Sequence, residues 1–292
     1  MAPVSLEFFP PKTDEQRAQL EHALPKLKAL TPEFVSVTFG AGGSTLTHTP
    51  RTVRYLREIH ALEVAPHVSC MGGSREEIGA LLNDYRDLGC KRIVALRGDL
   101  PSGMASPGDF RYASDLVAFI RREHDGWFHI EVACYPECHP QSDHAQADLK
   151  HFKAKVEAGG DGAITQYFFN ADAYFRFVDD ARAAGITIPI VPGIMPIANF
   201  AQLRRFSEMC GAEIPRWIGK RMIAYGDDAE SVREFGADVV AAMCRRLLEG
   251  GAPGLHIYTL NRARATMAML RHLDVADERK DRSPPDRARG RL

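Results

Sequence analysis

The segment Arg92-Ile-Val-Ala-Leu-Arg-Gly-Asp99 shows the pattern of the whole chain, because a short apolar run is followed at once by charged residues and a glycine. Such a run, rich in branched side chains and bounded by glycine, predicts a buried β-strand that leads into a loop. Similar runs recur along the chain, and the intervals between them show helical spacing of apolar residues. The eight expected strands are Val4–Phe9, Phe34–Phe39, Val64–Ser69, Arg92–Leu96, Ile130–Tyr135, Ala163–Phe168, Ile188–Ile194 and Leu255–Leu260.

This alternation predicts the fold class. Strands that alternate with helices form βαβ units and a parallel sheet, which places the chain in the α/β class. Eight units fit a closed (β/α)8 (TIM) barrel, which typically takes about 250 residues. We therefore expect one barrel domain over residues 1–273 of the 292-residue chain. The stretches Leu100–Asp109 and Gly211–Gly226 are expected to be long connections between elements.

The last residues, 274–292, have a different composition. From Asp277 onward the sequence DERKDRSPPDRARGRL is almost entirely charged residues, proline and glycine. Such a segment cannot bury enough apolar surface to offset the entropy lost on ordering it. We expect a disordered tail, with a basic interaction arm as the alternative.

Composition excludes several classes of protein. The 37 basic and 38 acidic residues nearly balance, which argues against a dedicated nucleic-acid surface. No apolar run approaches the roughly 18 residues that span a bilayer, and the N-terminus lacks a secretory signal. The six cysteines are scattered without a CxxC pair, as in proteins with reduced thiols. We expect a cytoplasmic protein that binds neither nucleic acid nor membrane.

Polar residues stand where the expected strands end, and in a TIM barrel the active site lies at the C-terminal ends of the strands. Their convergence on one rim predicts an enzyme. These residues are Glu7, Thr38, His67, Arg97, Asp99, Tyr135, Glu137, His139, Gln166 and Tyr258.

Glu7 lies between bulky apolar neighbours in Leu6-Glu-Phe-Phe9. Because an unpaired buried carboxylate is costly, its side chain is expected to point into a polar site. Desolvation should raise the pKa of Glu7, which suits a general acid near neutral pH. The alternative is a strand-end glutamate that faces solvent.

Two pairs of charged residues suggest a site for an anionic cofactor. Arg97 and Asp99 flank Gly98, where glycine allows close approach and arginine offers a planar fork to phosphate or carboxylate. Asp148 and Lys155 are seven residues apart on an expected helix and so share a face, where they would suit hydroxyls and phosphates. The alternatives are a local Arg–Asp turn and a solvated helix face.

Other motifs limit the chemistry. No GxGxxG or GxxxxGK[ST] motif is present, so a nucleotide cofactor would have to lie in a barrel mouth. Cys134, Cys138 and His139 lack a second Cys/His cluster at ligand spacing, so no metal is predicted. The amide of Gln166 offers a donor and an acceptor for the edge of a heterocycle. His67, a lone histidine in an apolar strand, is more typical of a core residue.

Eight motifs in order resemble the methylenetetrahydrofolate reductases, over residues 4–272. They are Ser5-Leu-Glu-Phe-Phe-Pro-Pro11, Phe34-Val-Ser-Val-Thr-Phe-Gly-Ala41, Ala65-Pro-His67, Ala95-Leu-Arg-Gly-Asp-Leu-Pro101, Tyr135-Pro-Glu-Cys-His139, Ala163-Ile-Thr-Gln-Tyr-Phe-Phe169, Pro192-Gly-Ile-Met-Pro196 and Tyr258-Thr-Leu-Asn-Arg262. The resemblance is to the bacterial type, which has the catalytic barrel alone. It implies FAD at the strand ends, NADH or NADPH as co-substrate, and ping-pong reduction of 5,10-methylenetetrahydrofolate to 5-methyltetrahydrofolate for methionine synthesis. It also implies a homo-oligomer.

The resemblance implies roles for individual residues. Glu7 would be the general acid that opens the folate ring, and Asp99 would lie near the flavin and the pterin. Phe206 would stack on the nicotinamide and the folate in turn. The positions that match FAD-binding residues are Thr38, His67, Arg97, Gly98, Asp99, Ala133, Tyr135, His139, Asp148 and Lys155, and those on the folate side are Gln166, Gln202, Phe206, Tyr258 and Arg262.

Two other functions fit parts of the sequence. A metal-dependent lyase or hydrolase would use His67, Glu137 and His139. A flavin-free relative would bind folate as a partner subunit without catalysing its reduction.

Overall fold

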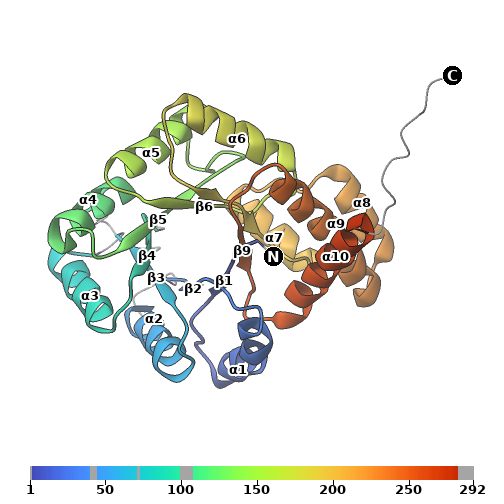
Figure 1. Cartoon of the computed structure of the whole chain (residues 1–292), viewed down its shortest axis with the longest axis horizontal. Coiled ribbons are helices and arrows are strands. Elements are labelled where there is room, and N and C mark those ends of the chain that lie inside the picture. Colours follow the sequence, from blue (N-terminus) through green and yellow to red (C-terminus); the bar gives the residue numbers. More distant parts are fainter. Residues whose placement is uncertain (1, 40–44, 71–72, 99–107, 282–292) are drawn as a thin grey trace.

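The apolar runs form strands of one parallel sheet with helices on its outer side (Figure 1). The computed structural model describes residues 2–39, 45–70, 73–98 and 108–281, with only the backbone of 45–47 and 274–281. Within these ranges the strands are β1 Val4–Phe8, β2 Val35–Val37, β3 Val64–Ser69, β4 Arg92–Leu96, β5 His129–Cys134, β6 Gly162–Thr165, β7 Ile190–Val191, β8 Gly193–Ile194 and β9 Leu255–Tyr258. The expected α/β barrel is confirmed.

The helices follow the strands around the barrel. They are α1 Asp14–Lys28, α2 Thr45–Arg54 with a π-helical turn at Tyr55–Ile59, α3 Arg75–Asp87, α4 Ala113–His124, α5 Ala145–Glu157, α6 Ala171–Ala183, α7 Phe200–Cys210, α8 Arg216–Tyr225, α9 Ala229–Glu249 and α10 Ala263–Asp281. None of the described helices is long and apolar enough to cross a membrane.

The barrel closes at a proline, which corrects one expectation. Ile188–Ile194 was expected to be a single strand, but it forms β7 and β8 on either side of Pro192. Proline has no N–H to donate to a strand ladder. β7 pairs with β6 and β8 pairs with β9, while the Pro192 carbonyl accepts a hydrogen bond from His256 N at 3.0 Å. One short segment therefore joins the two ends of the strand order.

One further segment differs from the sequence-based expectation. Part of Gly211–Gly226, expected to be a connection, is helix α8. Helix α10 is Ala263–Asp281, and the expected boundary between barrel and tail at residue 273 stays a prediction. The end of α10 consists mostly of Ala, Asp, Glu, Arg and Lys, which are all compatible with a helix. Each residue added to an existing helix closes one more hydrogen bond. Residues 282–292 lie outside the described part of the chain.

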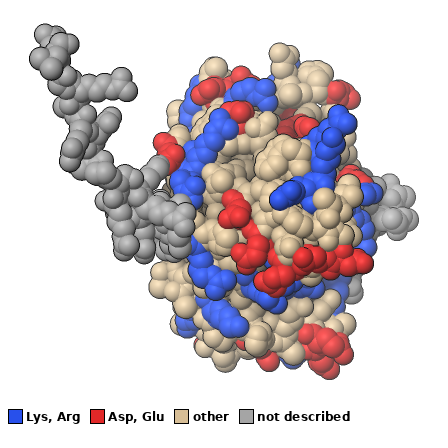
Figure 2. Space-filling view, turned by 90° about the vertical axis from the view of Figure 1, so that its right-hand side faces the viewer, with Lys and Arg blue, Asp and Glu red and all other residues tan. Residues whose placement is uncertain are grey.

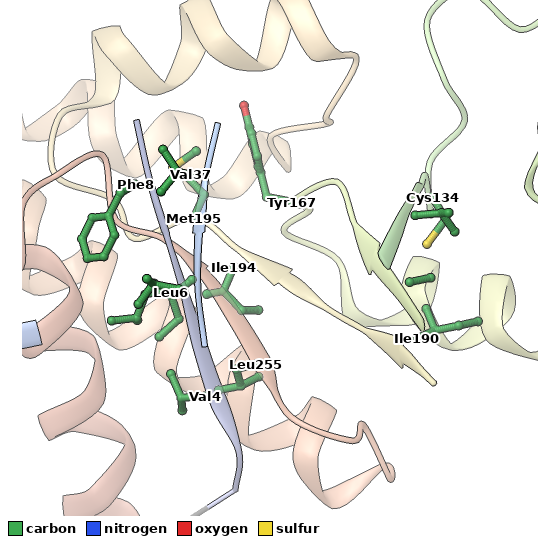
Figure 3. Packing of buried hydrophobic residues seen from close by; sticks show 14 of the residues in the cluster. Val4, Leu6, Phe8, Val37, Cys134, Tyr167, Ile190, Ile194, Met195 and Leu255 are labelled. Carbon is green, nitrogen blue, oxygen red and sulfur yellow. The ribbon is translucent and has the colours of Figure 1, made fainter. Parts of the chain in front are cut away.

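Strand alternation determines which side chains reach the barrel interior. Val4, Leu6 and Phe8 of β1 are buried in the main hydrophobic core, and Figure 3 shows them along the strand beside Ile194 and Leu255. The residues between them, Ser5 and Glu7, point to the opposite side of the sheet. One face of β1 therefore supplies the core and the other supplies polar groups to the barrel interior.

Helix caps fix the helices that approach the site. Helix α3 begins with a capping box, since Glu77 N donates to Ser74 Oγ at 3.1 Å and Ser74 N donates to the Glu77 carboxylate at 2.9 Å. Helix α5 begins after His144, whose Nδ1 accepts from Ala147 N at 3.2 Å. This start places Asp148 in the first turn of α5.

Candidate active site

Two adjoining cavities lie at the C-terminal ends of the strands. The first, here called the mouth pocket, has a volume of about 310 Å³, and the second, the rim pocket, has about 290 Å³. The mouth pocket is lined by Glu7, Phe8, Phe9, Thr38, His67, Val94, Leu96, Ala133, Tyr135, Ile164, Gln166, Tyr167, Met195, Tyr258 and Leu260. The rim pocket is lined by Ala95, Leu96, Arg97, Gly98, Tyr112, Ala113, Ser114, Ala133, Tyr135, His139, Gln141, Ser142, Asp148, His151 and Lys155. The two cavities share Leu96, Ala133 and Tyr135, so one elongated ligand can occupy both.

The Glu7 carboxylate lies at the floor of the mouth pocket between two imidazoles. Its Oε2 atom is 3.3 Å from His67 Nε2 and 3.6 Å from His256 Nε2. His67 Nε2 is buried and faces the Glu7 carboxylate. The Glu7 side chain is 17% exposed, whereas that of His256 is fully buried.

A polar network below Glu7 holds His256 in place. His256 Nδ1 and Ser5 Oγ are 2.8 Å apart. The Ser36 hydroxyl donates to Glu7 Oε2 at 3.4 Å and lies 3.5 Å from His256 Nε2. These residues come from β1, β2 and β9, which are hydrogen-bonded neighbours in the sheet. The network therefore connects Glu7 to the interior of the barrel.

The pKa of Glu7 corrects the sequence-based expectation of a raised value. Burial raises the pKa of Glu7, as expected, but the neighbouring His256 and His67 lower it by a larger amount. The resulting pKa of Glu7 is about 2. In the ligand-free protein Glu7 is therefore ionised at neutral pH. The earlier expectation overlooked two histidines that lie 60 and 249 residues away in the sequence.

Tyr258 and Gln166 form the wall opposite to β3. The Tyr258 hydroxyl donates to the Thr165 carbonyl at 2.7 Å, which fixes the ring against the end of β6. Burial raises the pKa of Tyr258 well above its usual value, so the phenol stays neutral. The Gln166 amide oxygen accepts from Tyr167 N at 3.0 Å. Within the part of the chain that the structure describes, the amide NH₂ group has no partner, and it can donate to a ligand.

The rim pocket contains a half-buried lysine. Lys155 Nζ donates to the Ala133 carbonyl at 2.5 Å, and burial lowers the pKa of Lys155. Asp148 Oδ2 accepts from His139 N at 2.9 Å, and Arg97 contacts the Gln141 side chain. Lys155, Asp148 and Arg97 thus line one cavity.

Aromatic rings border the rim pocket. The rings of Tyr135 and His139 meet edge to face with centroids 4.5 Å apart, and Tyr112 stacks on His151 at 5.7 Å. Tyr112, Gln141 and His151 were not predicted as site residues. The stretch that precedes Tyr112 looked like a connection. Gln141 lies in the loop before α5 and His151 lies on α5, so the three residues share no short motif.

Some predicted site residues lie elsewhere. Gln202 and Phe206 are half-buried on α7 and line neither pocket, although Tyr167 in the mouth pocket approaches Ser207 of α7, with their hydroxyls 3.1 Å apart. Arg262 is exposed and lines a different cavity. Asp99 lies outside the described residues, so its expected role stays a prediction.

Ser5, Ser36 and His256 were missed by the sequence analysis. Strand alternation carried a signal, since Ser5 is two residues from Glu7, and His256 two residues from Tyr258, on the same face of each strand. That spacing would have placed both residues in the barrel interior.

The metal-dependent alternative finds no matching geometry. His67 lines the mouth pocket and His139 the rim pocket, while Glu137 accepts a hydrogen bond from Glu213 N at 2.9 Å. Within the described ranges no group of three or more His, Cys, Asp or Glu residues is placed to bind a metal ion.

Comparison with known proteins identifies the family. A family model for methylenetetrahydrofolate reductase matches residues 1–274. The 5,10-methylenetetrahydrofolate reductase of Escherichia coli K12 is 42% identical over 272 residues, covering 93% of this chain and 90% of that protein. The Arabidopsis thaliana methylenetetrahydrofolate reductase (NADH) 1 is 37% identical over 289 residues, covering 94% of this chain and 49% of that protein.

A solved structure shares the fold at low sequence identity. An uncharacterized Clostridium thermocellum protein that binds two copies of 5-methyl-5,6,7,8-tetrahydrofolic acid superposes with a TM-score of 0.64 at 16% identity, covering 95% of this chain and 96% of that one. Together with the family match, the strand-end motifs and the barrel lead to one assignment. The chain belongs to the methylenetetrahydrofolate reductase family and is an oxidoreductase.

Proposed function

We propose that this protein reduces 5,10-methylenetetrahydrofolate to 5-methyltetrahydrofolate, with FAD bound across both pockets and NADH or NADPH as the electron donor. The observation that carries the proposal is the continuity of the two cavities. A carboxylate with two imidazoles lies at the floor of one, and a half-buried lysine lies in the other.

The residues present fit a flavin dinucleotide. Lys155 and Arg97 in the rim pocket suit the phosphates, and Asp148 suits the ribose or ribityl hydroxyls. The apolar walls of the mouth pocket, among them Leu96 and Met195, suit a flat ring. His67, which lines the same pocket, suits the polar edge of that ring. When bound, the flavin supplies the hydride that the reaction needs.

The protein's own chemical task is a proton transfer. Conversion of the methylene bridge to a methyl group breaks one C–N bond, adds a hydride to the carbon and adds a proton to the nitrogen that leaves. Glu7 is the group in the mouth pocket whose carboxyl can hold that proton. Gln166, with its free amide NH₂, would orient the pterin edge.

Glu7 must take up its proton before it can give it away, because its pKa is about 2 in the free protein. A ligand that fills the mouth pocket removes water from Glu7, which favours its neutral form. His67 and His256 lie within 3.6 Å of Oε2 and are the nearest groups from which a proton can come. Folate binding and protonation of Glu7 would therefore be coupled.

One mouth pocket would serve both substrates in turn. With the flavin in place, the dinucleotide and the folate would each need the same open side of the flavin ring. Exclusive occupation predicts ping-pong kinetics, in which the oxidised dinucleotide leaves before the folate binds. Parallel lines in double-reciprocal plots with either substrate varied would support this order, and intersecting lines would contradict it.

The test begins with the purified protein under anaerobic conditions. We expect it to be yellow, to lose its absorbance near 450 nm on addition of NADH or NADPH, and to regain it with 5,10-methylenetetrahydrofolate. Glu7→Gln should keep the first step and lose the second by about 10²-fold or more, the usual contribution of a general acid. Loss of both steps at similar rates would remove Glu7 from the proton-donor role. A colourless protein that binds folate would favour the flavin-free alternative.

A further inference from the structure

Glu137 is a half-buried carboxylate that the proposed reaction does not use. Tyr135 and His139, on either side of it in the loop after β5, line the rim pocket, whereas Glu137 lines neither pocket. Its Oε2 atom accepts a hydrogen bond at 2.9 Å from Glu213 N, in the connection between α7 and α8. Burial raises the pKa of Glu137, and this hydrogen bond offsets part of the rise. One carboxylate therefore joins two segments of chain that are 76 residues apart.

The two segments also touch beside this hydrogen bond. Gly211, the C-cap of α7, has a φ of +75°, and a methyl group there would lie 2.9 Å from the Pro140 ring and 3.8 Å from the Cys138 carbonyl oxygen. Glycine suits both the left-handed backbone and the close approach. Residues 137–140 and 211–213, here called the junction, thus meet at two points.

One side of the junction belongs to the loop that borders the rim pocket. His139 N donates to Asp148 Oδ2 at 2.9 Å, and Gln141 N donates to His139 Nδ1 at 3.0 Å. Cys138 has a φ of +88°, which is a strained conformation for a residue with a side chain. Such a conformation persists only where the surrounding contacts enforce it. The position of Glu137 therefore depends on contacts made by the lining of the rim pocket.

The other side of the junction leads to the mouth pocket through the last turn of α7. Gly211 N donates to the Ser207 carbonyl at 2.9 Å, and the buried Ser207 hydroxyl lies 3.1 Å from the Tyr167 hydroxyl. Tyr167 lines the mouth pocket, where its N–H donates to the Gln166 amide oxygen at 3.0 Å. An unbroken series of contacts thus runs from Glu137 to two residues of the mouth pocket. Coupling between sites can travel through such packed and hydrogen-bonded contacts.

We propose that Glu137 is a positioning residue, which couples the two pockets by tying residues 211–213 to the loop of the rim pocket. This inference rests on the proposed function, because it takes the two ligands to be the flavin and the folate. FAD in the rim pocket would fix the loop around His139. The hydrogen bond from Glu213 to Glu137 would then fix the end of α7, and with it Tyr167, before the folate binds.

The test measures amide hydrogen exchange in residues 207–215, with and without FAD. In the wild type FAD should slow exchange there, although these residues line neither pocket. Glu137→Ala removes the acceptor, so exchange in the FAD-free variant should be about threefold to tenfold faster, as expected for one lost hydrogen bond. FAD should no longer slow it. Glu137→Gln keeps an oxygen that accepts from Glu213 N, so this variant should respond to FAD as the wild type does.

A second measurement follows the mouth pocket. The FAD-loaded Glu137→Ala variant should bind 5-methyltetrahydrofolate about fivefold or more weakly than the wild type in calorimetry, the usual size of coupling between two sites. Glu137→Gln should keep the wild-type affinity. Glu234→Ala is the control, because the Glu234 side chain is 55% exposed on α9. Figure 2 shows acidic side chains at the surface on the side of the molecule that carries this helix. The control should match the wild type in both measurements.

The outcomes separate the two proposals. If FAD slows exchange equally in Glu137→Ala and in the wild type, the coupling is overturned and the proposed function is untouched. Equal losses in Glu137→Ala and Glu137→Gln would overturn the hydrogen bond to Glu213 as its cause. Failure of FAD to bind would count against the proposed function instead. Because coupling is reciprocal, 5-methyltetrahydrofolate alone should then slow exchange in residues 137–142 of the wild type but not of Glu137→Ala. Absence of that difference would overturn the inference.

Discussion

At the scale of single residues, the chemistry of the mouth pocket depends on the neighbours of one carboxylate. Burial and pairing act on Glu7 in opposite directions, and the two histidines outweigh burial. The pairing also stabilises the folded protein, because a carboxyl group whose pKa is lower in the folded state favours folding wherever it is ionised. Glu7 thus contributes to stability in the free protein.

This contribution gives a pH-dependent prediction. The folded pKa of Glu7 is about 2, below its usual value of 4.5, so its stabilising effect is complete well above pH 4.5 and is lost as the pH falls towards 2. The difference in unfolding free energy between wild type and Glu7→Gln should therefore shrink by about 2 kcal/mol from pH 6 to pH 3. Urea unfolding at a series of pH values measures it. A constant difference across that range would show that the histidines do not hold Glu7 ionised.

A second buried carboxylate, Glu131, closes the opposite end of the barrel interior. Its side chain is 3% exposed and pairs with Arg92, which also contacts Glu33 at 2.9 Å. Arg92→Met would leave Glu131 buried without its main cation and should cost about 3 kcal/mol of stability. Arg122→Met removes an exposed pair with Glu123 and should cost less than about 0.5 kcal/mol. Similar midpoints for the two variants in denaturant would disprove this account, and adding Glu131→Gln to Arg92→Met should recover part of the loss.

At the scale of elements, closure of the barrel depends on the short strands on either side of Pro192. A methyl group on Gly193 of β8 would overlap the Thr165 carbonyl oxygen and lie 2.7 Å from the Tyr258 ring. That oxygen is backbone and also accepts the Tyr258 hydroxyl, so it cannot move aside without loss of the bond. The absence of a side chain at Gly193 therefore lets β8, β6 and Tyr258 meet.

Gly193→Ala should accordingly destabilise the protein by about 3 kcal/mol or more, the upper range for overpacking. The matched control is Gly126→Ala, because a methyl group there meets nothing within 4 Å and the backbone needs no positive φ. The control should be neutral or slightly stabilising, since alanine reduces the entropy of the unfolded chain. Thermal unfolding of the two variants checks the contrast, and equal melting temperatures would mean that β8 has room to shift.

The same elements show what the sequence could predict. Apolar runs marked the strands, because burial between helices and barrel interior demands continuous apolar residues. The break at Pro192 was missed because the residues on both sides of the proline are apolar. The sequence therefore has the pattern of one uninterrupted strand, although Pro192 lacks the N–H that a strand ladder needs. Helix α8 was missed since Gly219 weakens its helical pattern and no side chain caps it at Pro215. The pairing of Glu7 with His256 could not be predicted from sequence motifs, because β1 and β9 are neighbours only in the closed barrel.

At the scale of the whole molecule, the barrel joins two cavities that different strands and helices build. Strand ends supply the mouth pocket, and α5 and the loops around it supply much of the rim pocket. The two cavities share three lining residues, so a ligand in the mouth pocket can extend into the rim pocket.

The continuity of the mouth and rim pockets leads to a final prediction. Ala133 lines both cavities, so Ala133→Leu would place a bulky side chain at their junction. A dinucleotide that spans the junction should lose affinity by about tenfold or more, as expected when a well-packed contact is overfilled. A ligand confined to the mouth pocket should be much less affected. Reconstitution of the apoprotein with FAD or with riboflavin, followed by measurement of bound flavin, separates the two cases.

Ala183→Leu on the exposed face of α6 is the control and should bind FAD as the wild type does. Equal losses for FAD and riboflavin would show that both molecules lie in one cavity, and the proposed binding of FAD across the junction would then have to be abandoned.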